Sequence, residues 1–91
     1  MYLSLSIVMD WDIYAWINRG SRRKSILELL AKSEKPLSTN DIKKSLKIAI
    51  SQASFTLKEL LSKKLIECVN PSDKIGKLYV ITKKGNVLLT K

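Results

Sequence analysis

The sequence predicts one small α+β domain in which helices come first and a β-hairpin follows. Its 91 residues are the length of a single domain, below the size at which chains usually divide into two. Between residues 21 and 64 the apolar residues recur with helical spacing, whereas residues 65–69 and 77–81 are rich in β-branched and aromatic side chains. A composition of 45% hydrophobic and 27% charged residues supplies one modest core.

The first 20 residues are predicted to form a separate N-terminal segment. Residues 2–8 alternate between apolar and polar side chains, which favours a short strand or an arm that pairs with another chain. Asp10 or Asp12 can begin a helix that ends near Gly20. Three residues at i, i+3 and i+4 spacing form the apolar face of this helix: Ile13, Trp16 and Ile17.

Two further helices are predicted from their start signals. Ser21 is a candidate N-cap for a helix of about a dozen residues, which must end before Pro36. Ser38 is a candidate N-cap for the second helix, roughly residues 39–46, and Asp41 three residues later completes a capping box. The apolar residues expected inside are Ile26, Leu27, Leu30 and Ala31 on the first helix and Ile42 and Leu46 on the second.

The third helix is predicted to be the longest and follows a tight connection at residues 47–49. It is expected over about residues 50–64. At roughly 100° per residue, one of its sides is apolar and faces the core. That side holds Ala53, Leu57, Leu60 and Leu61. The opposite side presents Ser51, Gln52, Phe55, Lys58, Glu59 and Ser62.

The two β-rich segments are joined by a loop, NPSDKIG, that contains Asn-Pro and a glycine. This pattern predicts a hairpin with a basic loop at residues 70–77, which we call the wing. Cys68 alternates within the first strand and is expected to be a small buried apolar residue. Thr82 is a candidate cap for a short last helix that contains Val87 and Leu88.

Two short helices joined by a three-residue turn form the helix-turn-helix pattern. The hairpin with a basic tip that follows them makes the predicted fold an α+β winged helix-turn-helix, with a three-helix core and a β-hairpin wing. The predicted organisation is therefore an N-terminal arm at residues 1–20, for dimerisation or core packing, and a winged helix DNA-binding domain at residues 21–91.

Over about residues 20–90 the chain resembles the archaeal winged-helix transcription regulators of the broad MarR/ArsR type. Three stretches in this order carry the resemblance: SFTLKELLSKKLIE, the NPSD turn and LYVITKKG. The turn has Lys47, and the end of the third helix has Lys64, where the family usually has glycine. Ala49 stands where a serine or threonine commonly caps the recognition helix. We therefore expect a strained or altered turn.

Several classes of protein are excluded by composition. With no histidine and one cysteine, the chain lacks His-based catalysis, an internal disulfide and the thiolate–imidazole metal sites of ArsR-type sensors. No nucleophile–base pair or Gly-rich phosphate loop can be assembled, so we expect no enzyme activity, metal or cofactor. No apolar stretch approaches the length of a membrane span. The lone cysteine fits a reducing compartment, and we expect a cytoplasmic protein.

The charge indicates a polyanionic partner. The chain has 17 Lys and Arg residues against 8 Asp and Glu residues, a net charge of +9. Residues 1–18 contain only Asp10 and Asp12, so residues 19–91 hold 17 basic and 6 acidic residues, a net +11. Such a charge implies nucleic acid or an anionic membrane surface. The basic residues are spread over several elements instead of one amphipathic face, so double-stranded DNA is favoured over a membrane.

The third helix is the predicted recognition helix, whose first two turns would enter the major groove. Ser51 and Gln52 can bond to base edges, and glutamine pairs best with adenine, while the outward Phe55 can contact thymine methyls or another protein. Basic residues elsewhere are expected on phosphates, and the wing on the backbone or minor groove. The candidate DNA contacts are Ser51, Gln52, Ser54, Phe55 and Lys58 on the third helix, Arg22 and Arg23 on the first, Lys43, Lys44 and Lys47 on the second helix and turn, and Lys74 and Lys77 on the wing.

The residues support one leading function and one alternative. The leading hypothesis is a sequence-specific DNA-binding transcription regulator; the alternative, favoured by Phe55, is a protein-interaction module in a transcription or replication assembly. Apolar and aromatic residues are concentrated before Ser21, so a homodimer assembled through residues 2–18 is expected. In a competing arrangement, residues 2–8 add a third strand to the hairpin of the same chain. Whether a small-molecule effector binds stays open.

Overall fold

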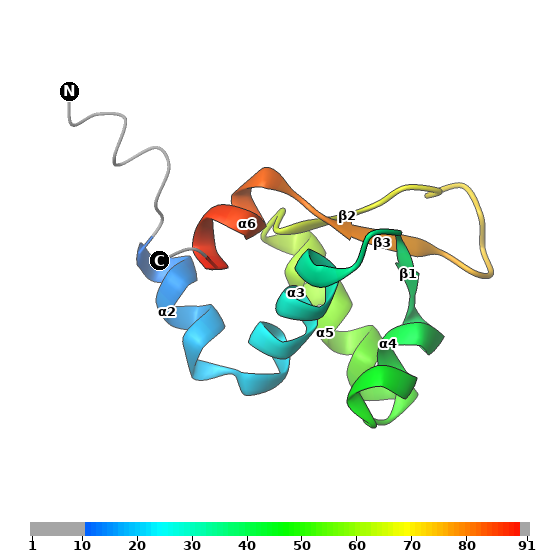
Figure 1. The fold of residues 1–91 in the computed structure, drawn as a ribbon, viewed down its shortest axis with the longest axis horizontal. Helices are drawn as coiled ribbons and strands as arrows, with labels where there is room; N and C mark the ends of the chain where they lie inside the picture. Colours follow the sequence, from blue (N-terminus) through cyan, green and yellow to red (C-terminus); the bar gives the residue numbers. More distant parts are fainter. Residues whose placement is uncertain (1–10, 90–91) are drawn as a thin grey trace.

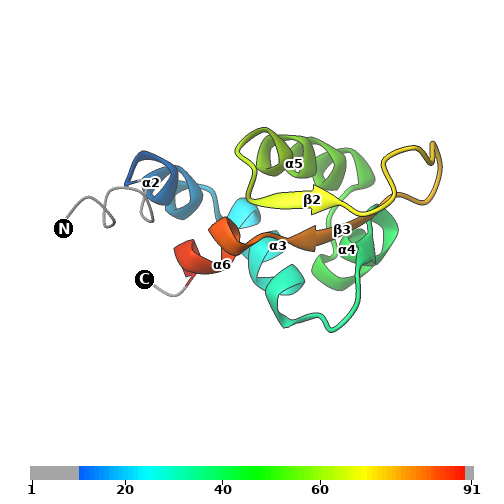
Figure 2. The same ribbon diagram turned by 90° about the horizontal axis from the view of Figure 1, so that it is seen from above.

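The computed structural model describes residues 11–89 and has the predicted α+β winged-helix fold (Figure 1). Its elements in chain order are α2 (Trp11–Arg19), α3 (Ser21–Lys32), β1 (Leu37–Ser38), α4 (Thr39–Leu46), α5 (Ile50–Ser62), β2 (Ile66–Cys68), β3 (Leu78–Ile81) and α6 (Lys83–Leu89). α3, α4 and α5 form the helical core, and the β2–β3 hairpin lies across them (Figures 1 and 2). α2 and α6 lie at one end of the molecule, and the loop of the hairpin lies at the other.

The sheet has three antiparallel strands in the order β1-β3-β2, one more than the predicted hairpin. Leu37 pairs with Tyr79 across β1 and β3, and Ile66 pairs with Ile81 across β2 and β3. β1 has only two residues and so has no periodicity that a sequence could show. Because β1 occupies one edge of β3, further strand addition is possible only along β2 or β1. The strand or arm expected at residues 2–8 lies outside the described residues.

The apolar faces predicted for the helices meet in one core. The side chains with essentially no exposed surface are Ile26, Leu27, Ile42, Ala53, Leu60 and Leu65, with Leu57 and Ile66 at 2%. One predicted core residue is wrong: Ala31 is exposed. Leu46 and Leu61 are half-buried and pack against the core. Thr56 is buried instead, at 1% exposed, because a residue three positions after Ala53 shares its helix face.

The helix boundaries follow the predicted caps with two corrections. α4 begins with the predicted capping box: the Ser38 Oγ accepts the N–H of Asp41, and the Asp41 carboxylate accepts the N–H of Ser38. Ser21 is the first residue of α3 and not its N-cap. Gly20 has that role because its carbonyl accepts the N–H of Lys24. α6 begins as predicted, since Thr82 Oγ1 accepts the N–H of Gly85.

The second correction concerns the end of α5, which stops at Ser62 although the helix was predicted to reach residue 64. Lys64 adopts a left-handed conformation with φ of 62°, and the N–H of Leu65 bonds back to the carbonyl of Leu60. This is a Schellman motif, which closes the helix and turns the chain into β2.

α2 confirms the helix predicted before Gly20. Ile17 is buried in the common core, and Ile13 and Trp16 pack against that core while half-buried, as expected. None of the helices within residues 11–89 is long and apolar enough to cross a membrane.

Candidate nucleic-acid interface

The helix-turn-helix consists of α4, a turn at residues 47–49 and α5. Lys47, which stands where the resembling regulators usually have glycine, lies in the left-handed region with φ of 56° and ψ of 48°. The turn therefore keeps the glycine geometry with a lysine in it. Ala49 has no side chain that can cap α5, as expected, but Gln52 supplies half of a cap. The Gln52 Oε1 accepts the N–H of Ala49 at 3.3 Å.

The first two turns of α5 present a polar surface to solvent. Ser51 and Gln52 are exposed, Ser54 is half-buried, and Phe55 and Lys58 are exposed. The carbonyl oxygen of a glutamine side chain has two lone pairs and its amide nitrogen has two N–H groups. Gln52 can therefore cap α5 through one lone pair and still offer an acceptor and a donor to an adenine edge. Phe55 is 63% exposed, which is unusual for so large an apolar ring.

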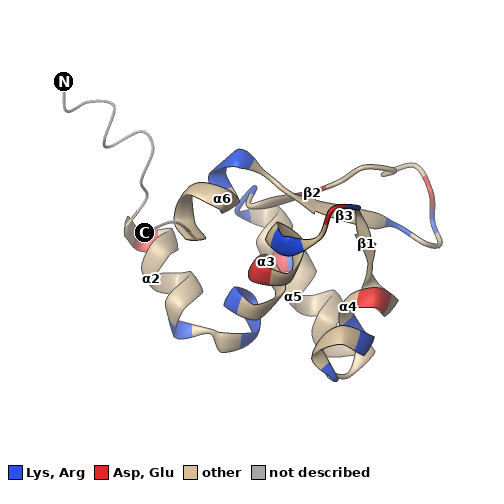
Figure 3. Cartoon of the chain, in the orientation of Figure 1, with Lys and Arg blue, Asp and Glu red and all other residues tan. Residues whose placement is uncertain are grey.

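Basic residues occur on the elements at both sides of this surface, and Figure 3 shows them as blue segments on α4 and on the loop of the hairpin. On one side, Lys44 and Lys47 are exposed and Lys43 is half-buried at the end of α4 and in the turn. On the other, Lys74 is exposed and Lys77 is half-buried in the wing. Lysine ammonium groups in such positions bind phosphate as point charges.

The wing stands next to the beginnings of α4 and α5. A hollow with a volume of about 230 Å³ lies between the wing and these two helix starts. It is lined by Ser38, Thr39, Asn40, Ile50, Gly76 and Lys77. The N-terminal N–H groups of a helix attract anions, so this hollow is suited to a phosphate. Thr39 and Asn40 were missed by sequence reasoning. The available signal was two polar residues in the first turn of a helix beside a basic loop.

Arg22 and Arg23, which the sequence groups together, have different environments. The Arg23 Nη1 donates to the carbonyl of Trp16 at 2.9 Å, and its guanidinium stacks 4.0 Å from the centre of the Trp16 ring. The same guanidinium forms an ion pair with Glu59 of α5 at 3.4 Å. Arg22 is exposed. Arg23 thus joins α2, α3 and α5 within the fold, and Arg22 remains available to a partner.

A second hollow brings Arg22 close to Phe55. It measures about 380 Å³ and lies between the α2–α3 corner and α5. Its lining residues are Arg19, Gly20, Ser21, Arg22, Arg23, Phe55, Thr56 and Glu59. Arg19 is a basic residue here that the sequence did not single out, because its position at the end of α2 is also explained by the helix dipole.

Two ionisable groups near the interface have shifted pKa values. The pKa of Asp41 lies below its ordinary value of 3.8 because its carboxylate accepts hydrogen bonds from the Ser38 backbone N–H and hydroxyl. The pKa of Tyr79 is raised, first by burial and second by the neighbouring Cys68. Cys68 is half-buried, and so less enclosed than predicted. Within residues 11–89 no three His, Cys, Asp or Glu side chains gather into a metal site.

No protein-family model matches the sequence, and no curated protein matches it significantly. Solved structures do match. Staphylococcus aureus MepR in complex with DNA is 27% identical with a TM-score of 0.69, over 99% of this chain and 78% of that one. A single-residue variant of S. aureus MepR is 33% identical with a TM-score of 0.66, over 75% of this chain and 51% of that one.

A third structure, a MarR-family transcription regulator, is 24% identical with a TM-score of 0.68, over 87% of this chain and 57% of that one. Several of the matching proteins are about twice as long as the part that this chain spans. The structural neighbours are transcription regulators and not enzymes. The chain therefore has the winged-helix fold of the MarR-type regulators.

Proposed function

We propose that this chain is a sequence-specific regulator of transcription that binds double-stranded DNA, with α5 in the major groove and the wing on the backbone or minor groove. One observation carries the proposal. The exposed polar start of α5 lies between two groups of lysines, one on α4 and the turn and the other on the wing. A helix flanked in this way can contact base edges while lysines on both sides hold phosphates. The DNA complex of MepR supports it.

In this arrangement the DNA contacts divide into two classes. Ser51, Gln52 and Ser54 would contact base edges, with Phe55 against a thymine methyl and Lys58 on the following phosphate. Positioning contacts would come from the lysines around α5 and from the first helix: Arg22, Lys43, Lys44, Lys47, Lys74 and Lys77. Arg23 is left out of this set because Glu59 and Trp16 already hold its guanidinium.

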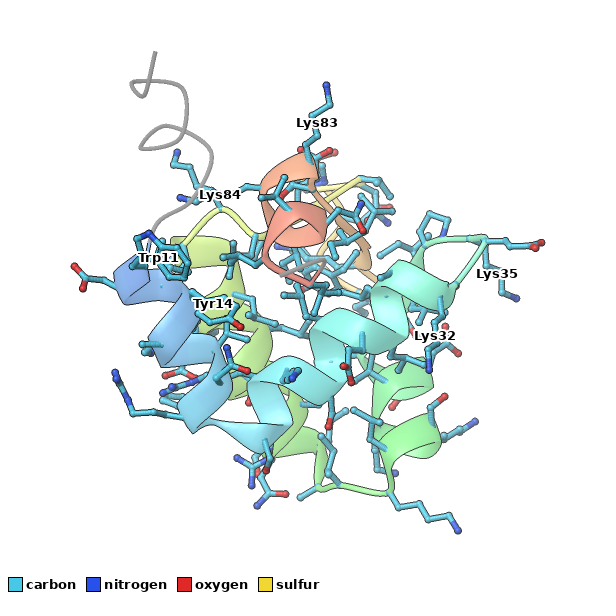
Figure 4. All side chains as sticks on the ribbon, turned by 60° about the vertical axis from the view of Figure 1, so that its left-hand side comes forward. Trp11, Tyr14, Lys32, Lys35, Lys83 and Lys84 are labelled. Carbon is cyan, nitrogen blue, oxygen red and sulfur yellow. The ribbon has the colours of Figure 1, made fainter. Side chains whose placement is uncertain are left out.

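The salt dependence of binding tests the electrostatic part of the proposal. Each neutralised phosphate lowers the log–log slope of affinity against salt by about 0.9, so the six positioning contacts together with Lys58 give a slope of about −6 per protomer. The Lys74→Ala, Lys77→Ala double variant should flatten this slope by about 2 and weaken all duplexes alike. The matched control removes the same charge from α6, by replacing Lys83 and Lys84 (Figure 4). α6 lies at the end of the molecule opposite the loop of the hairpin (Figures 1 and 2). A flat slope for the natural chain would refute DNA binding.

Base recognition is tested at Gln52, on a duplex selected by the chain from a random pool. Gln52→Ala should cost roughly 1–3 kcal/mol on the selected duplex and little on random DNA. A thermal melt controls for the lost cap on Ala49. Should both duplexes weaken by the same factor, Gln52 does not contact a base.

A second function, a protein-interaction module, is favoured by Phe55 alone. An aromatic ring that is 63% exposed on the outward face of α5 is also what a protein interface contains at its centre. The same salt titration separates the two functions, because a protein interface formed around Phe55 would not give a steep salt slope with duplex DNA.

We further propose a homodimer that is formed by the N-terminal arm, residues 1–20, together with the end of the molecule where α2 and α6 lie. Trp11 is 66% exposed and stacks edge-on against Tyr14, with ring centres 5.5 Å apart (Figure 4). Two copies of a winged helix can contact half-sites about one DNA turn apart. Sedimentation equilibrium should give a dimer at tens of micromolar and a weaker one for Trp11→Ala. A monomeric natural chain would refute the dimer.

The place of action follows from the proposed partner. A DNA-binding regulator with a single free cysteine fits the reducing compartment that holds the DNA, and we propose a cytoplasmic location. The named structural matches are bacterial proteins, so the archaeal part of the resemblance stays a prediction.

A further inference from the structure

The tip of the wing carries an apolar side chain in an unusual position. Ile75 is 90% exposed, which is the highest exposed fraction of any large hydrophobic residue within residues 11–89. Isoleucine is one of the residue types that proteins most often bury completely. A single exposed apolar residue needs no explanation in itself. Two features of its surroundings, the shape of the loop and the charges beside the tip, indicate a function for Ile75.

The loop that carries Ile75 has a defined shape. Asn70 lies at its base, where its Oδ1 accepts the N–H of Leu78 at 2.7 Å. The Asn70 Nδ2 donates both to the Asp73 carboxylate at 2.9 Å and to the Gly76 carbonyl at 3.2 Å. Gly76 adopts φ of +73°, which only glycine does without strain. These bonds tie the residues on both sides of the tip to Asn70, so less conformational entropy would be lost when the tip inserts into a partner.

The charges beside the tip match a nucleic acid groove. Lys74 precedes Ile75 and Lys77 follows it after one glycine, while the one acidic residue of the loop, Asp73, is bonded to Asn70. Lys77 also lines the hollow shared with the starts of α4 and α5. The wing and the recognition helix can therefore contact one duplex, with the lysines on the phosphate strands on either side of a minor groove.

We infer that Ile75 is an apolar wedge that enters the minor groove beside the site of α5, partly unstacks one base step and bends the duplex. Proteins that bind the minor groove insert isoleucine, leucine, methionine or phenylalanine in this way and kink the DNA away from the inserted side chain. Pyrimidine–purine steps are the most easily unstacked. Ile75 would thus give the chain a preference for such a step at a position where it makes no hydrogen bond to a base. The inference depends on the proposed DNA binding.

The test uses the full chain and a duplex that the chain selects from a random pool, with a fluorescent dye at each end. Energy transfer between the dyes measures the bend, and anisotropy measures affinity. Ile75→Ala should remove the bend and weaken binding about tenfold, and it should abolish the preference for a pyrimidine–purine step under the wing. Ile75→Leu should keep the bend and the affinity. The matched control is Val69→Ala, which shortens another exposed aliphatic residue, 47% exposed, at the base of the hairpin.

The possible results separate this inference from the proposed function. If the natural chain binds no duplex, both fail. If it binds with a steep salt slope but Ile75→Ala bends and binds the duplex as the natural chain does, only the wedge is refuted. Should Ile75→Ala leave the DNA unaffected and instead reduce binding to anionic phospholipid vesicles, the tip is a membrane contact and the inference is overturned.

Discussion

Two lysines of this chain stand in backbone conformations that favour glycine. Lys47 after α4 has φ of 56°, and Lys64 after α5 has φ of 62°. In both places the following N–H bonds back to the helix: the N–H of Ile48 to the carbonyl of Lys43, and the N–H of Leu65 to that of Leu60. The left-handed residue is therefore required by the way each helix ends. We predict that Lys47→Gly and Lys64→Gly each stabilise the fold.

The size of the effect follows from two opposed contributions. A side chain in the left-handed region costs roughly 1–2 kcal/mol relative to glycine. Glycine in turn loses about 0.4–1 kcal/mol, because it has more freedom in the unfolded chain. The net gain is about 0.5–1 kcal/mol for each site. In a domain of this size, 1 kcal/mol corresponds to about 4–8 °C in melting temperature. Both side chains are exposed, so neither substitution removes core packing.

Urea and thermal unfolding of five proteins test this reasoning: the natural chain, both glycine variants, and Lys47→Ala and Lys64→Ala. The alanine variants remove the same positive charge but keep the Cβ atom, so they should gain little. If alanine stabilises as much as glycine, relief of charge repulsion is the cause and the backbone argument is refuted. DNA binding separates the two sites, because Lys47→Gly should lose a phosphate contact and Lys64→Gly should not.

Three further predictions concern packing, capping and pH dependence. Gly85→Ala should lower the free energy of unfolding by roughly 1–3 kcal/mol in a urea titration, because a Cβ there would lie 2.5 Å from the Leu65 carbonyl oxygen and 2.7 Å from the Ile81 Cγ1; an unchanged midpoint would contradict it. Ser38→Ala should cost about 0.5–2 kcal/mol through the lost cap. Since the pKa of Asp41 is lowered from 3.8, its stabilisation is complete above that value and is lost as the pH falls through the lowered pKa. Asp41→Asn should thus lose less stability than the natural chain when melts are taken at stepped pH below about 5, and parallel curves for the two would count against this.

The parts of the fold that the sequence predicts depend on neighbouring residues. The α4 capping box is complete within four residues, and the helix faces follow from spacing alone. At Lys47 and Lys64 the sequence shows a lysine where the resembling regulators usually have glycine. The structure shows that the backbone has the left-handed conformation at both positions all the same.

The parts that the sequence did not predict depend on residues far apart in the chain. β1 becomes a strand only because Leu37 and Ser38 lie beside β3. Thr56 is buried because the face of α5 around it is covered, although threonine residues are mostly exposed in proteins. β1 has no signal within a local window, because it is decided by what packs against the segment after folding. For Thr56, the helix spacing places it on the same face as Ala53, but its residue type does not indicate burial.

The contribution of each basic residue to the candidate interface also depends on residues far apart in the chain. The net charge of the sequence includes every basic residue equally. In the fold, some basic side chains are paired within the domain and others are exposed to a partner. Arg23 is held by Glu59, which lies 36 positions away, and by the ring of Trp16, so its charge is already neutralised within the domain. The lysines around α5 have no comparable partner in the structure described. The attraction for a polyanion therefore comes chiefly from α4, the turn and the wing, and less from the first helix than its run of basic residues indicates. Replacing Arg23 should then alter stability more than the salt slope, and replacing Lys44 should do the reverse.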